Sequence, residues 1–169
     1  LGVRARQGLE MLVVDGDPMP EPEDSEAFFL TRALSPQGSL SPIRVTERRL
    51  YNFGPQDALD LNAYDVVALL NVGALDPAQA ARLEAYVRGG GHLLVSLGDN
   101  TVFSEWNRLP LLPARLTGFR APTEGASERF ARLKIADPDH PAAGSLQHSP
   151  GLDALNVRGF VALEPLPDL

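Results

Sequence analysis

Stretches of hydrophobic residues are separated by polar stretches along this chain, and the clearest pattern of this kind covers residues 64–99. Residues 66–70 form a continuous apolar run, which is typical of a β-strand covered on both faces. Apolar residues then recur at helical spacing, namely Ala80, Leu83, Tyr86 and Val87. Residues 92–97 form the next apolar run and predict a second buried strand. The segment therefore predicts a strand–helix–strand unit of a parallel sheet, with a right-handed crossover.

The residues at both ends of the predicted helix support its boundaries. Asp76 is the expected N-cap and Pro77 the first helical residue. Three glycines at 89–91 end the helix, because glycine accepts the left-handed conformation at low cost. They precede a strand, whereas a phosphate-binding loop follows a strand and opens a helix. These glycines therefore predict a helix end and no phosphate site.

The remaining sequence predicts further elements of both kinds. A helix over residues 25–34, capped by Ser25 or Asp24, directs Phe28, Phe29 and Leu30 into the core. Residues 101–109 predict a short helix, 56–61 a helical turn or loop, and 137–150 a loop. Strands are expected at residues 10–14, 43–48, 115–119, 130–135 and 157–163. We therefore expect a single α/β domain over 1–169, with an α/β core at 10–109 and a β-rich extension at 110–169.

Composition narrows the classes of partner and chemistry. The net charge of −7 disfavours a nucleic-acid partner, since phosphate binding requires clustered Lys and Arg. With no cysteine, the chain has no disulfide, thiolate metal site or thiol nucleophile. No apolar run approaches the roughly 20 residues of a membrane span. The chain starts without methionine, and both ends resemble cuts in a longer protein, so we expect it to be a fragment.

Polar residues follow three of the predicted strands, where open α/β sheets bind ligands. These candidate ligand-binding residues are Asp15, Asp17, Asn71, Asp99 and Asn100. They would form an acidic, hydrogen-bonding pocket at one edge of the sheet, suited to a cation with oxygen ligands. Alternatively, they begin turns and cap helices, as Asp and Asn commonly do. The sequence alone leaves both readings open.

Other chemistries receive weaker support from the sequence. A response-regulator receiver needs an aspartate where this chain has Asn71. A metal site in the late loop would use Asp139, His140 and His148, but their spacing is not specific. A triad of Ser96, His140 and Asp137 would lack the G-x-S-x-G elbow. We therefore expect no metal and no cofactor.

The segments YDVVALLNV (64–72) and LDPAQAARLEAYVRGGGHLLVSLGD (75–99) resemble the class I glutamine amidotransferase-like superfamily. They are closer still to its non-catalytic branch in bacterial membrane proteins of the Bat aerotolerance type. In those proteins, membrane helices and a von Willebrand A domain precede an amidotransferase-like domain. The segments MLVVDGDP, SEAFFLTRAL, SPIRVTERR and VRGFVALEP also look like that branch. The resemblance implies a flavodoxin-like three-layer sandwich with a mostly parallel sheet.

The same resemblance implies that amidotransferase chemistry is missing. Active members carry a nucleophilic cysteine on a sharp strand-to-helix elbow, and alignment of that elbow places Leu97 there, within a residue or so. Neither His140 nor His148 begins the His-x-Glu pair of active members. We therefore expect an inactive, extramembrane domain of a membrane-anchored protein, on the extracytoplasmic side by a slight preference. Its expected partners are other domains of the same protein or a protein complex.

Overall fold

The computed structural model describes residues 8–54, 57, 59–121, 130–140, 144–146, 149 and 151–167 of the 169-residue chain. Two compact units divide the chain. The first comprises Leu1–Pro113 with Pro167–Leu169, and the second comprises Ala114–Leu166. Among the described residues, no helix has the length and apolar character that crossing a membrane requires.

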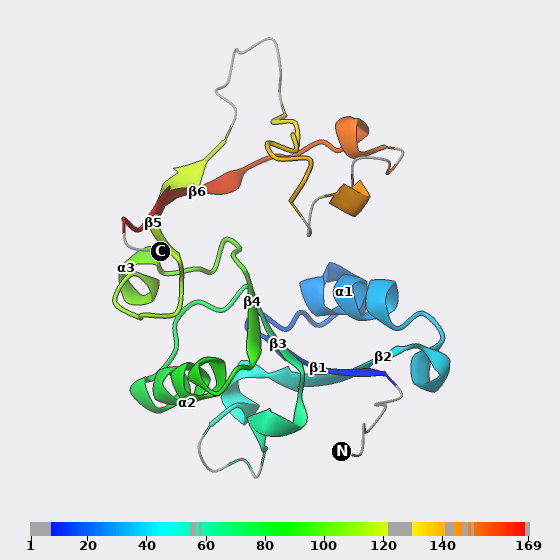
Figure 1. Ribbon diagram of the computed structural model, residues 1–169, viewed down its shortest axis with the longest axis vertical. Coiled ribbons are helices and arrows are strands. Elements are labelled where there is room, and N and C mark those ends of the chain that lie inside the picture. The colour runs from blue at the N-terminus through cyan, green and yellow to red at the C-terminus, as the bar shows by residue number, and fades with distance from the viewer. Residues whose placement is uncertain are drawn as a thin grey trace. The chain divides into compact units, whose positions relative to one another are not determined.

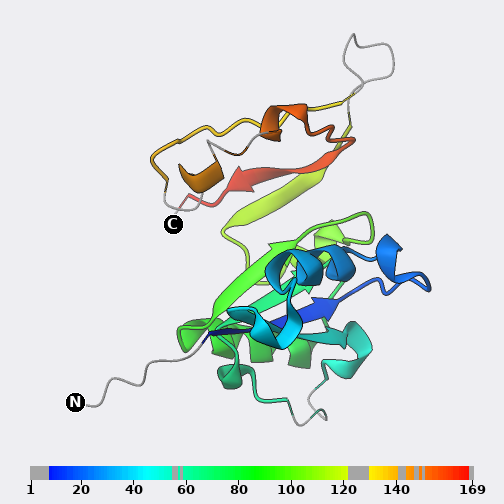
Figure 2. The ribbon, with the colours of Figure 1, turned by 90° about the vertical axis from the view of Figure 1, so that its right-hand side faces the viewer.

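A four-stranded parallel sheet forms the centre of the first unit (Figures 1 and 2). Its strands are β1 (Leu9–Asp15), β2 (Ile43–Arg49), β3 (Val66–Leu70) and β4 (His92–Ser96). Their order in the sheet is β2-β1-β3-β4. The helices of this unit are α1 (Glu26–Leu34), α2 (Pro77–Arg88) and the four-residue α3 (Phe103–Trp106). The α/β prediction is confirmed, and the strand order is compatible with a flavodoxin-like fold.

Helices α1 and α2 cover opposite faces of this sheet (Figure 1). Side chains alternate across a strand, so every second residue of β1 and β3 meets the same helix. On the α1 face, Ala27 packs with Met11, Val13, Ala68 and Leu70 in a buried cluster. The residues between them, such as Leu12 and Val67, are fully buried on the face that α2 covers. This double burial confirms the continuous apolar runs as central strands.

The predicted boundaries of α2 are confirmed. Asp76 is the N-cap, Pro77 is the first helical residue, and Gln79 completes a capping box. At the other end Gly90 adopts the left-handed conformation at φ 95°. The buried stripe differs from the prediction at one position, because Val87 is 39% exposed.

Tyr86 anchors the end of α2 to the strands beside it. Its side chain is only 5% exposed, and its hydroxyl donates to the carbonyl oxygens of Tyr64 (3.2 Å) and His92 (3.4 Å). Burial raises the pKa of Tyr86 above its ordinary value of 10.0, and the Asp65 carboxylate acts in the same direction. The folded state therefore favours the neutral phenol.

Tyr86→Phe should lower the free energy of unfolding at pH 7 by about 1 kcal/mol, because the carbonyl oxygens of Tyr64 and His92 lose their hydroxyl donor. The advantage of the wild type should be constant below pH 10. It should shrink as the pH rises above 10, since the phenol ionises first in the unfolded state. Denaturant unfolding of both proteins between pH 7 and pH 11 measures this. A difference that grows with pH would contradict the assigned role.

Besides that of Val87, two predictions of burial in the first unit are wrong. Phe29 is 61% exposed, while Phe28 is half-buried and meets the Phe29 ring edge-on. Consecutive helical residues point about 100° apart, so the core side of α1 accepts only one of the two. β4 is not buried on both faces, because it is an edge strand that α1 does not reach. Leu94, next to Ala68 in the register, is 47% exposed.

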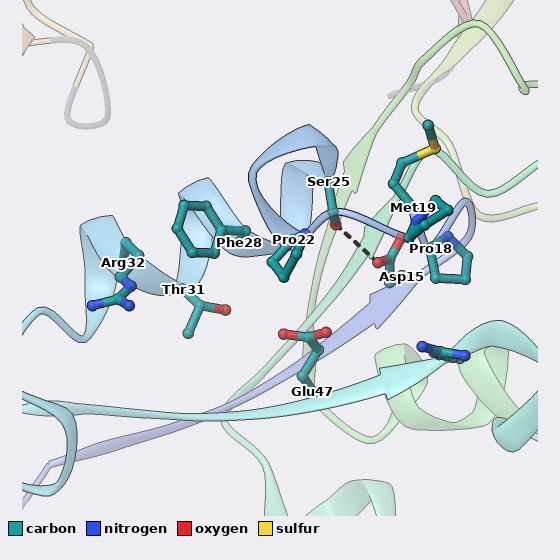
Figure 3. Close-up of a pocket in the computed structure, with 11 residues that line it drawn as sticks. Asp15, Pro18, Met19, Pro22, Ser25, Phe28, Thr31, Arg32 and Glu47 are labelled. Carbon is teal, nitrogen blue, oxygen red and sulfur yellow. Dashed lines mark hydrogen bonds between the residues drawn. The ribbon is translucent and has the colours of Figure 1, made fainter.

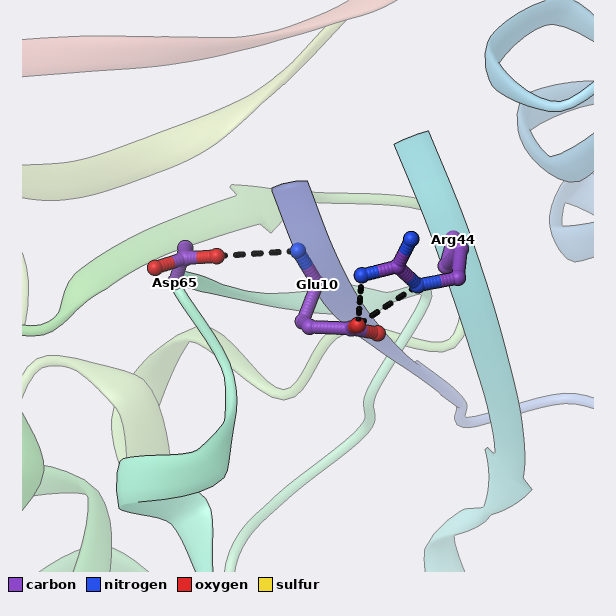
Figure 4. A network of polar contacts seen from close by, with 3 residues as sticks. All are labelled: Glu10, Arg44 and Asp65. Carbon is purple, nitrogen blue, oxygen red and sulfur yellow. Dashed lines mark hydrogen bonds and ion pairs between the residues drawn. The ribbon is translucent and has the colours of Figure 1, made fainter. Parts of the chain in front are cut away.

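Polar side chains tie together the beginnings of the strands (Figure 4). The Asp65 carboxylate, just before β3, accepts from the backbone N–H of Glu10 in β1 (2.9 Å). Arg44 of β2 donates through Nε to the Glu10 carboxylate (2.6 Å). This chain of contacts links β2, β1 and β3 at the amino edge, away from the strand ends where a ligand site is expected.

The second unit contains a two-stranded antiparallel sheet of β5 (Ala114–Arg120) and β6 (Phe160–Pro165). Both fall close to predicted strands. The predicted strand at 130–135 is wrong, because among these residues only Ala131 forms a bridge, to Val157. In the first unit, the helix predicted at 101–109 shrinks to α3. Part of the predicted turn at 56–61 and of the loop at 137–150 lies outside the described residues.

Candidate functional site

The carboxyl ends of β1 and β3 lie where the strand order of the sheet reverses. From β1 the chain goes to β2 at one edge, and it then returns to β3 on the other side of β1. The helix after β1 and the helix after β3 cover opposite faces (Figure 1). Open α/β sheets bind ligands at such a switch point. Asp15 ends β1 and Asn71 directly follows β3, so both predicted residues lie there.

Asp15 holds the start of α1 against the end of β1. It is 2% exposed, and its Oδ2 accepts from the Ser25 hydroxyl (2.9 Å). Its Oδ1 accepts from the backbone N–H of Asp17 (3.1 Å). The Ser25 hydroxyl oxygen accepts in turn from the N–H of Ala27 (3.1 Å), which confirms Ser25 as the N-cap of α1. Each carboxylate oxygen of this buried aspartate thus has a donor, as a buried charge requires.

Asn71 is the hub of the remaining candidate residues. Its side-chain nitrogen donates to Glu26 Oε1 (3.2 Å) and Asp99 Oδ1 (3.0 Å), and its Oδ1 accepts from the N–H of Asn100 (3.0 Å). Its own N–H donates to the carbonyl of Ser96 (2.9 Å). With φ at 47°, it is the only non-glycine residue in the left-handed region within the described part of the chain. We refer to Glu26, Asn71, Asp99 and Asn100 as the Asn71 cluster.

Glu26 was not predicted as part of the site. It is the first residue of α1 and follows Ser25, so neighbouring side chains connect that helix to both strand ends. In the sequence, an acidic residue in the first turn of a helix is ordinary, because it complements the helix dipole. The one sequence feature that could have indicated this cluster is Asn71, because asparagine tolerates a left-handed conformation and its side chain carries two N–H donors.

The loops around Asn71 approach so closely that two glycines leave no room for a side chain. A Cβ on Gly16 would lie 2.5 Å from Val72 Cα and 2.6 Å from the Asn71 carbonyl oxygen. A Cβ on Gly98 would lie 2.4 Å from Asn71 Oδ1. The loop after β1, the loop after β3 and the loop after β4 are therefore packed against one another.

The five predicted residues consequently fall into two groups rather than one acidic pocket. Asp15 holds the start of α1 through Ser25 and accepts from the N–H of Asp17, whereas Asn71, Asp99 and Asn100 share direct hydrogen bonds. Of the five, only Asp15 lines the pocket that lies between α1 and β2. Within the described residues, no three His, Cys, Asp or Glu side chains are arranged to hold a metal ion. Asp15 forms a local turn with Asp17, and Asn71, Asp99 and Asn100 connect the loops after β3 and β4, while none of the five is the N-cap of α1, α2 or α3.

The chain after β4 does not form a nucleophile elbow. The Gly98 N–H donates to Thr101 Oγ1 (3.0 Å), and the Thr101 N–H donates to the Gly98 carbonyl (3.3 Å). This turn separates Leu97 from α3, which begins only at Phe103. An elbow instead places its nucleophile directly between a strand and the helix that follows.

The alternative sites in the late loop gain no support from the geometry. Asp137 and His140 belong to the second compact unit, whereas Ser96 belongs to the first. His148 lies outside the described residues.

Comparison of the chain with models of protein families, with curated proteins and with solved structures found no significant match.

Proposed function

We propose that the chain is a catalytically inactive, amidotransferase-like domain with a binding or assembly role in a larger bacterial membrane protein. The observation that carries this proposal is the closure of the Asn71 cluster. The side-chain amide of Asn71 is committed to Glu26, Asp99 and Asn100, and both oxygens of Asp15 accept hydrogen bonds. The polar groups at the switch point thus serve the packing of loops and offer no activated nucleophile.

The family component of the proposal is supported by two further features. The strand order β2-β1-β3-β4 is compatible with a flavodoxin-like sheet. The resemblance aligns Leu97, within a residue or so, with the catalytic cysteine, and leucine cannot form a covalent acyl intermediate. A rigid sheet without this chemistry still offers surfaces on which other domains of the same protein can assemble.

The purified chain incubated with glutamine should release no ammonia above the buffer blank, with or without added Mg²⁺. An active glutamine amidotransferase assayed in parallel serves as the positive control. The alternative function is a hydrolase that uses a cation at Asp15, Asp17 and Asp99, or a small-ligand sensor with an acidic pocket at the same strand ends. Two results would favour that alternative and count against the proposal. One is release of ammonia that depends on Mg²⁺. The other is a rise in melting temperature with Mg²⁺ that Asp15→Asn abolishes.

A further inference from the structure

A pocket of about 240 Å³ lies between α1 and β2, beside the end of β1 (Figure 3). Its lining combines apolar and charged side chains. Phe28 and Thr31 of α1 face the strand, and Glu47 points from β2 toward them. The full lining is Asp15, Pro18, Met19, Pro20, Pro22, Ser25, Phe28, Thr31, Arg32, Glu47 and Arg49. None of these residues belongs to the Asn71 cluster, so the two features are separate.

Three charged side chains in this lining have no ion pair among the described residues. Arg49 and Glu47 make no side-chain hydrogen bond there either, and Arg32 makes a cation–π contact with Phe28 at 5.3 Å from the ring centroid. Thr31 Oγ1 is enclosed and has no hydrogen-bond partner. By contrast, Asp15 is fully engaged by its neighbours. Glu47 and Arg49 are exposed to solvent, so a ligand that enters the pocket can reach both charges.

The strand register sets the spacing of two of these charges. Glu47 lies opposite Val13 and Arg49 opposite Asp15, so both are on the α1 face of β2. Two residues along a strand correspond to about 6.6 Å. A cation and an anion thus line the same wall at a spacing that a short, two-ended ligand can bridge. Phe28 and Met19 add apolar surface for its carbon skeleton.

We propose that this pocket binds a small organic carboxylate that also carries an amino group. Arg49 takes the carboxylate, because a guanidinium donates two parallel hydrogen bonds to that group. Glu47 accepts from the amino group. Arg32, which rests on Phe28, contributes positive charge without a direct bond. The inference goes beyond an assembly role, which needs no such pocket.

The test compares three compounds with the same carbon chain length: 5-aminopentanoate, pentanoate and pentylamine. In calorimetric titration of the full chain, 5-aminopentanoate should bind with at least tenfold higher affinity than either one-ended compound, since each one-ended compound lacks one of the two charged contacts. Arg49→Gln and Glu47→Gln should each weaken binding of 5-aminopentanoate by about tenfold or more.

Arg48→Gln is the matched control, because Arg48 lies between these residues on β2 and does not line the pocket. It should leave the affinity unchanged. Equal affinity for the three compounds, no binding up to about 10 mM, or an equal loss in the Arg48→Gln control would each overturn the proposal. These results leave the ammonia assay unaffected, so the pocket and the proposed function fail separately.

Discussion

Gly16→Ala is expected to lower the free energy of unfolding by about 3 kcal/mol or more, the upper range for a side chain forced into a packed interior. The new Cβ would meet Val72 Cα at 2.5 Å and the Asn71 carbonyl oxygen at 2.6 Å. Both contacts are with backbone, which cannot rotate away as a side chain would. Relief therefore requires the loops after β1 and β3 to separate, which also stretches the hydrogen bond from the Gly16 N–H to the Leu70 carbonyl (2.8 Å).

Gly54→Ala is the matched control for this experiment. Among the described residues its Cβ would meet only the Asp57 carboxylate oxygen, at 3.7 Å, which is an ordinary contact, and Gly54 lies outside the left-handed region. The control should change stability by no more than about 0.5 kcal/mol. Denaturant titration monitored by circular dichroism measures both variants. Equal effects would show that the approach of the two loops is not as close as described.

Asn71→Ala is the second substitution with a large expected effect, a loss of about 4–5 kcal/mol in the free energy of unfolding. It removes the amide that joins Glu26, Asp99 and Asn100. Each of these hydrogen bonds contributes about 1 kcal/mol. It also places alanine at φ 47°, a conformation that costs a residue with a Cβ about 1–2 kcal/mol.

Asn71→Gly separates the two causes, because glycine adopts the left-handed conformation freely while still losing the amide. It should be about 1 kcal/mol more stable than Asn71→Ala, and both should be less stable than the wild type. The unfolding free energies of the three proteins decide the point. If the glycine variant is as stable as the wild type, the side-chain amide contributes nothing to stability and Asn71 serves only to adopt the left-handed backbone conformation.

The features that the sequence predicted well are those with local causes. The start of α2 depends on Asp76, Pro77 and Gln79, three residues within four positions, so its cap can be read directly. The exposure of β4 could not be predicted in this way. An apolar run such as residues 92–97 is buried on both faces only if a helix or strand covers it, which depends on the rest of the chain. Leu94 is exposed because α1 packs against β1 and β3 and does not extend over β4.

The sequence predicted which of the candidate residues lie close together but not which hydrogen bonds they make. The rule that strand ends converge correctly brought Asn71, Asp99 and Asn100 together. It did not foresee that Asp15 turns toward Ser25. Side chains at the end of a strand alternate between faces, so adjacent strand ends can serve different loops. Glu26 was missed because its distance in sequence from Asn71 carries no local signal.

The central claim is that the switch point is closed by structural hydrogen bonds, and a double-mutant cycle between Asn71 and Asp99 tests it most directly. Unfolding free energies are measured for the wild type, Asn71→Gly, Asp99→Ala and the double variant. The two side chains share a hydrogen bond of 3.0 Å, so we expect a coupling of about 1 kcal/mol. Additive effects, with each single variant as stable as the wild type, would contradict the claim and would leave the polar side chains after β3 and β4 available to a ligand.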